Sequence, residues 1–154
     1  MIQRIQTFYF IGAVLLVAVP LFMSHFFEIS FGSDILQVTP FYTKNVVTQK
    51  ITSTNYSWIL QMVIIFLLMV TIFSFKNRKR QIQLGWIAFS VHLISTAWIA
   101  LSTYLMTAQT SNVEESISME MGFFGFASAF LFIFLGIQGV RKDKALVDSL
   151  NRIR

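Results

Sequence analysis

Two histidines and seven carboxylates are the side chains of this 154-residue chain that could bind a metal or move a proton. Cysteine is absent, which excludes disulfide scaffolds, thiolate zinc sites and iron–sulfur clusters. No H-x-x-x-H or H-E-x-x-H spacing occurs, and the Walker A, G-x-S-x-G and dinucleotide-binding fingerprints are missing too. The sequence therefore predicts no catalytic residue, no metal site and no cofactor.

His25, Glu28 and Glu120 stand apart from the other ionisable groups because each borders an apolar run. A membrane enzyme that acts on lipid needs a nucleophile, an acid–base group or a metal at the membrane interface. These three residues supply one only if the fold brings them together. Glu120 alone has a simpler role, because a carboxylate at the start of a helix stabilises the helix dipole.

His92 lies inside an apolar run, near the expected midplane of the bilayer. Helical spacing places it on a polar stripe with Ser95 and Thr96. An ionisable group at that depth is a candidate proton relay, ligand contact or metal ligand. No carboxylate or second histidine is expected at the same depth. We therefore expect a neutral imidazole that is hydrogen-bonded to a hydroxyl group of a neighbouring helix.

The elements that hold these residues follow from composition. Hydrophobic residues make up 55% of the chain and charged residues only 12%, against about 25% in a soluble domain. A hydrocarbon core needs roughly 17 to 25 apolar residues for each crossing. The sequence predicts an all-α integral membrane protein, a bundle of four transmembrane helices in one domain, 1–154. The expected spans are 5–27, 58–75, 84–106 and 121–140.

Basic residues set the orientation of these spans in the membrane. Ten of the twelve fall in the amino terminus, the connection 76–83 and the tail 141–154, while only Lys44 and Lys50 fall on the other side. Both termini are therefore expected in the cytoplasm, with the chain spanning the inner membrane of a bacterium several times. The positive charge is expected to contact anionic lipids of the inner leaflet, not nucleic acid.

Three connecting segments carry further expectations. In the outer connection 28–57, the β-rich pieces Ile35–Thr39 and Val46–Thr54 predict a short β-hairpin. In the second outer connection, Thr107–Glu120, the fourth helix is expected to begin early. The tail 141–154 has apolar residues at helical spacing, so it either continues the fourth helix or lies on the inner leaflet as a basic amphipathic helix.

The fourth helix has two distinct faces. Small residues let helix backbones approach closely in lipid, where the hydrophobic effect does not drive association. Steps of 100° bring five small residues onto one face, which we expect to pack against another helix: Gly122, Gly125, Ala129, Gly136 and Gly139. Four phenylalanines gather on a different side and are expected to meet lipid or a partner: Phe123, Phe126, Phe130 and Phe134.

Three cytoplasmic stretches together resemble a known family: MIQRIQ at 1–6, FKNRKRQIQL at 75–84 and RKDKALVDSLNRIR at 141–154. The chain is similar from end to end to a domain-of-unknown-function family of four-helix inner-membrane proteins from Bacteroidota. The resemblance implies the same four spans, and it carries over no catalytic or binding residue.

These observations favour a non-enzymatic accessory or structural subunit of a larger inner-membrane complex, whose partner is another integral membrane protein. A small transporter or channel that acts as an oligomer is the first alternative. Such proteins carry charged residues or broken helices in their spans, whereas the four spans here contain no Asp, Glu, Lys or Arg, and His92 is the histidine expected near the midplane. A membrane enzyme acting on lipid is the second alternative.

Overall fold

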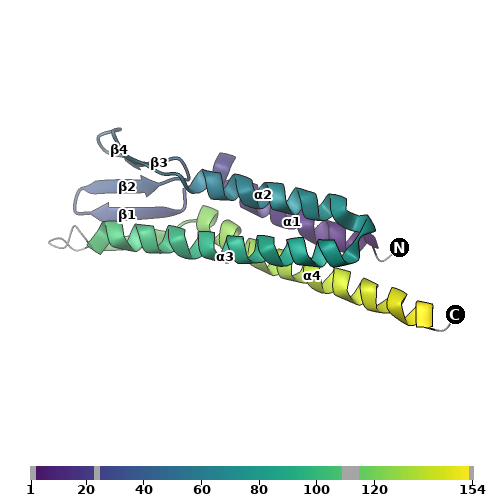
Figure 1. The fold of residues 1–154 in the computed structure, drawn as a ribbon. Helices are drawn as coiled ribbons and strands as arrows, with labels where there is room; N and C mark the ends of the chain where they lie inside the picture. Colours follow the sequence, from purple (N-terminus) through teal and green to yellow (C-terminus); the bar gives the residue numbers. More distant parts are fainter. Residues whose placement is uncertain (1–2, 23–24, 109–114, 153–154) are drawn as a thin grey trace.

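The computed structural model describes residues 3–22, 25–108 and 115–152. Four helices run along the chain: α1 (Gln3–Phe22), α2 (Ser57–Phe73), α3 (Arg78–Ala108) and α4 (Met121–Arg152), with a short 3₁₀ turn, η1 (Ser74–Lys76), between α2 and α3 (Figure 1). All four are long and apolar enough to cross a membrane. The four predicted helices are therefore confirmed.

Two helices extend beyond the apolar runs that predicted them. The basic residues after η1 begin α3, where the side-chain Oδ1 of Asn77 accepts a hydrogen bond from the backbone N–H of Arg80 at 3.2 Å. An asparagine in this position caps a helix. At the other end of the chain, α4 runs on to Arg152, so the basic tail continues the fourth helix.

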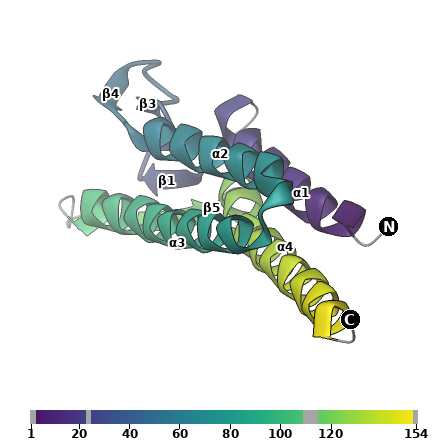
Figure 2. The same ribbon diagram turned by 45° about the vertical axis from the view of Figure 1, so that its right-hand side comes forward.

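The helices form one bundle, in which α1 packs against α4, α2 against α3, and α3 against α4. Figures 1 and 2 show the start of α1, the η1 turn and the end of α4 at one end of the molecule, opposite the strands. The bundle core is made of fully buried residues from all four helices: Phe10, Ala13, Val17, Ile64, Leu68, Ala88, Ile133 and Ile137. Many other apolar side chains of the helices are exposed, a pattern that is consistent with helices that cross a membrane.

The two outer connections build a five-stranded antiparallel sheet, in the order β4-β3-β2-β1-β5. The first connection supplies four strands and the second supplies one: β1 (Phe27–Phe31), β2 (Asp34–Val38), β3 (Tyr42–Asn45), β4 (Ile51–Thr54) and β5 (Glu115–Met119). The prediction of an all-α protein with one hairpin was therefore wrong in its outer part.

The errors have physical causes. The two predicted pieces correspond to β2 and β4, but β3 lies between them and pairs with both. Its Lys44-Asn45 sequence resembles a turn, and strand formation depends more on neighbouring strands than on propensity. The expected early start of α4 was also wrong, because residues 115–119 pair with β1, whose free backbone groups need hydrogen-bond partners.

Alternate side chains of β1 pack against the helix bundle. Phe27 and Ile29 are buried, whereas Glu28 lies on the opposite, partly exposed face. The Phe27 ring lies 4.6 Å from the ring of Phe123 in α4, and the preceding Phe26 lies 5.7 Å from Phe126. The sheet and the helices therefore share one core at this end of the molecule.

Candidate functional site

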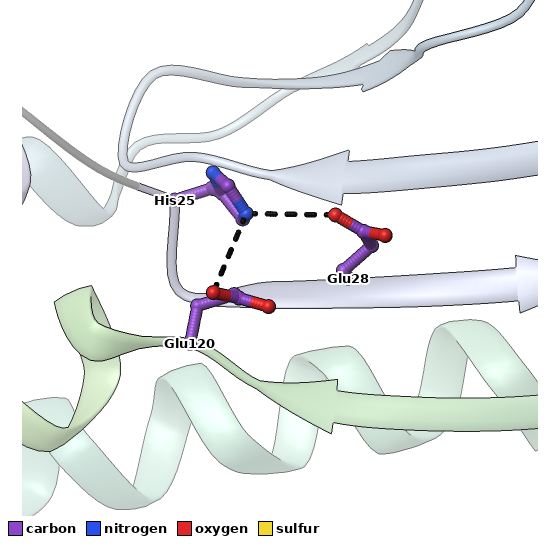
Figure 3. Close-up of side chains that lie close together, drawn as sticks. All are labelled: His25, Glu28 and Glu120. Atoms are coloured by element: carbon purple, nitrogen blue, oxygen red, sulfur yellow. Dashed lines mark ion pairs between the residues drawn. The ribbon is translucent and has the colours of Figure 1, made fainter.

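His25, Glu28 and Glu120 meet at the junction between the sheet and the bundle (Figure 3). His25 lies just before β1, Glu28 lies on β1, and Glu120 lies between β5 and α4. The His25 Nε2 atom is 3.7 Å from Glu28 Oε2 and 3.9 Å from Glu120 Oε2. The fold thus brings together three groups that the sequence separates.

Backbone hydrogen bonds hold the segments that carry these side chains. The Glu120 N–H donates to the Phe26 carbonyl oxygen at 3.0 Å, which joins the β5–α4 junction to the start of β1. In turn, the Glu120 carbonyl accepts from the N–H groups of Phe123 and Phe124 in the first turn of α4. The site is therefore positioned by the sheet and the helix end, independently of anything it binds.

Two polar neighbours orient the carboxylates. Gln37, which pairs with Glu28 across β1 and β2, donates from Nε2 to Glu28 Oε2 at 3.3 Å. Ser118 pairs with Glu28 on the other side, and its hydroxyl oxygen lies 3.3 Å from the Glu28 carbonyl oxygen and 3.5 Å from Glu120 Oε1, so its one proton can be donated to either. Such second contacts fix the geometry of ligating or proton-transferring groups. The arrangement has the groups needed to bind a cation or to transfer protons.

The predicted intramembrane site is more enclosed than expected. His92 and Ser95 are fully buried, and neither the imidazole nitrogens nor the serine hydroxyl have a hydrogen-bond partner. Instead, the His92 ring lies 4.6 Å from the ring of Phe126, and Thr96 donates to the His92 carbonyl oxygen within its own helix. The expected bond from His92 to a neighbouring hydroxyl group is therefore not formed.

Gln61 of α2 belongs to the same buried polar layer, and sequence reasoning missed it. Its side chain is fully buried and its amide atoms have no hydrogen-bond partner. With a rise of about 1.5 Å per residue, Gln61 lies about 18 Å from the η1 end of α2, and His92 lies about 21 Å from the η1 end of α3. The sequence did contain a signal for it: Gln61 is an uncharged polar residue within an apolar run, and it lies at about the same depth in α2 as His92 does in α3.

The small residues of α4 do not all have the expected role. Gly136 and Gly139 lie against α1, since an added Cβ would come within 2.8 Å of Phe10 and of Gln6, respectively. Gln6 also donates from Nε2 to the Gly139 carbonyl oxygen at 2.9 Å. By contrast, an added Cβ at Gly125 would meet nothing within 4 Å. Gly122 and Ala129 are buried, and Gly125 departs from the expected packing stripe.

The phenylalanine face needs a similar correction. Phe126 is fully buried between Phe26 and His92, whereas Phe130 and Phe134 are partly exposed. Phe126 therefore belongs to the core and does not face lipid. Phe126 is buried because Phe26, which precedes β1, packs against it. The sequence did not predict that the sheet would cover this part of α4.

At the opposite end of the bundle, an ion pair joins α3 to α4. Arg78 Nε donates to Asp143 Oδ2 at 2.7 Å, and the Asp143 side chain is almost completely buried. Nearby, the Arg141 guanidinium lies over the Trp86 ring, 5.2 Å from its centroid. These contacts give the basic end of the bundle a fixed structure.

Comparison with known protein families finds a match that covers nearly the whole chain. A family model described as "Domain of unknown function (DUF4293)" matches residues 2–153. No curated protein matches the chain.

Proposed function

The chain belongs to the family described as a domain of unknown function (DUF4293), and we propose that it is a non-enzymatic accessory subunit of a larger complex in a bacterial inner membrane. The partner is an integral membrane protein with an extracytoplasmic part. The sheet contacts that part, and lipid-facing sides of the helices lie beside the partner's own spans.

One observation carries this proposal: both edge strands of the sheet expose apolar side chains. Ile51 on β4 is 56% exposed, and Ile117 and Met119 on β5 are 44% and 55% exposed. Lipid covers such residues on the helices, but the strands lie beyond the ends of α1, α2 and α4, beside the last turns of α3 (Figure 1), where the proposed topology provides no lipid to cover them. Exposed apolar groups on free strand edges are typical of contact surfaces.

The proposal places the termini and the α2–α3 turn in the cytoplasm and the sheet in the periplasm. Ten basic residues then lie inside, where they contact anionic lipids. Because the chain has no cysteine, single cysteines report the topology directly. In spheroplasts, we expect an impermeant thiol reagent to label Thr48→Cys, in the exposed turn before β4, and to leave Asn77→Cys unlabelled until the membrane is opened. The reverse pattern would overturn the orientation.

A photocrosslinking residue at Ile51 or Ile117 tests the contact surface in intact membranes. We expect each position to give one discrete product that contains a larger membrane protein. Ser33, an exposed residue of the β1–β2 turn, is the matched position in the same sheet that belongs to neither edge strand, and we expect little product from it. Products of equal yield at all three positions, or products with this chain alone, would contradict the proposal.

A membrane enzyme acting on lipid is the second candidate, and the convergence of His25, Glu28 and Glu120 is the observation that favours it. An imidazole between two carboxylates has the groups for acid–base chemistry. We test it by incubating the purified chain with vesicles of mixed phospholipids and measuring the products released. Turnover that Glu28→Gln and Glu120→Gln abolish would favour the enzyme, and no turnover would leave the accessory subunit as the better proposal.

A further inference from the structure

We propose that His25, Glu28 and Glu120 form a binding site for one divalent transition-metal cation, with Zn²⁺ as the representative ion. The ion would join the start of β1 to the start of α4. This inference is separate from the accessory function, because it concerns what the purified chain binds without a partner.

The spacing of the three ligand atoms supports a shared cation. Imidazole nitrogen and carboxylate oxygen bind Zn²⁺ at about 2.0–2.2 Å, so two ligands at a tetrahedral angle lie roughly 3.4 Å apart. His25 Nε2 is 3.7 Å and 3.9 Å from the two facing carboxylate oxygens. All three atoms lie within 4.8 Å of one another. Small rotations of the two partly exposed carboxylates would complete the coordination.

The unused hydrogen-bonding capacity at the centre of the cluster also points to a ligand. The His25 Nε2 atom is enclosed but has no hydrogen-bond partner, because both carboxylate oxygens lie beyond hydrogen-bond distance. With His25 neutral, two carboxylates held this close repel each other unless another positive charge lies between them. A divalent cation satisfies the nitrogen and neutralises both carboxylates.

The surroundings have the features of a metal site. Gln37 donates a hydrogen bond to the Glu28 carboxylate, and the Ser118 hydroxyl lies 3.5 Å from the Glu120 carboxylate, where outer contacts of metal ligands are commonly found. A cavity of about 260 Å³ borders His25, and the Glu28 and Glu120 side chains are 30% and 37% exposed, so an ion can reach the carboxylates from solvent. Three protein ligands leave a fourth position for water, and one nitrogen with two oxygens suits zinc and its neighbours in the first transition row.

Zn²⁺ titration of the purified full-length chain, freed of metal with a chelator, tests the proposal. Competition with a chromophoric chelator measures affinity and stoichiometry, and no cysteine is present to bind zinc elsewhere. We expect one ion per chain and a rise in melting temperature on saturation. His25→Gln, Glu28→Gln and Glu120→Gln should each weaken binding at least tenfold, since even outer-contact losses cost 10- to 100-fold.

The controls separate this site from general binding. Asp34→Asn removes an exposed carboxylate at the start of β2, at the end of the β1–β2 pair away from His25. His92→Gln removes the other histidine. Both should bind Zn²⁺ as the unmodified chain does. Glu28→Asp and Glu120→Asp keep the charge but move the oxygen, so weaker binding with an unchanged circular-dichroism spectrum would link the loss to coordination. No binding by the unmodified chain, or equal binding by all variants, would overturn the site.

Discussion

Replacing Gly136 with leucine should separate α1 from α4 and leave little folded protein. A Cβ there would lie 2.8 Å from two atoms of the Phe10 ring. Phe10 is itself fully buried in the bundle core, so its ring has no free space to enter. Overpacking of this kind costs about 1–3 kcal/mol, and leucine adds three more carbon atoms beyond Cβ. In lipid, helix association depends on close packing because the hydrophobic effect does not drive it, so losing this contact weakens the α1–α4 pair directly.

Gly125→Leu is the matched control, because it is the same substitution in the same helix at a position where an added Cβ meets nothing within 4 Å. We expect a melting temperature in mild detergent close to that of the unmodified chain for Gly125→Leu. Gly136→Leu should melt lower by roughly 5 °C or more, or aggregate during purification. Equal melting temperatures for the two variants would contradict the α1–α4 packing.

Phe26→Ala should detach the sheet from the bundle. Phe26 is fully buried, its ring lies 5.7 Å from that of Phe126, and its backbone N–H and C=O bond to Val38 and Glu120. Losing a buried phenylalanine side chain costs about 3–5 kcal/mol, because a cavity remains. The loss falls on the contact between the sheet and α4, so we expect the strands to exchange amide hydrogens faster than the helices do.

Phe22→Ala is the control for this variant, since Phe22 is 81% exposed near the end of α1. Hydrogen exchange of both variants, read by mass spectrometry over residues 27–54 and 115–119, provides the measurement. Protection of these strands should fall in Phe26→Ala and stay unchanged in Phe22→Ala. Undiminished protection in Phe26→Ala would mean that the sheet is stable without the bundle.

The helices could be predicted from sequence because hydrocarbon thickness imposes a length and a composition on each span. The sheet could not, since its edge strand β5 is separated from β1 in the chain by two helices, and the two strands pair through backbone groups that do not specify the partner strand. The hairpin error at Lys44-Asn45 has the same origin.

The candidate site depended on that missing sheet. His25, Glu28 and Glu120 were recognised as interfacial groups, but only the pairing of β1 with β5 brings Glu120 to the other two. Within the bundle, His92 and Ser95 were identified on one face of α3. Gln61 of α2, which is buried at a similar depth in the bundle, was not grouped with them. Single-helix periodicity reports which face is polar, but it does not report which helix that face meets.

The mass of the assembly that contains this chain tests the accessory-subunit proposal most directly. The chain, tagged and produced at its natural level, is extracted in mild detergent and weighed by native mass spectrometry. The proposal predicts a complex with a larger membrane protein in fixed stoichiometry, which Ile51→Glu and Ile117→Glu weaken and Ser33→Glu does not. Recovery of the chain alone or with copies of itself, unchanged by all three substitutions, would contradict it.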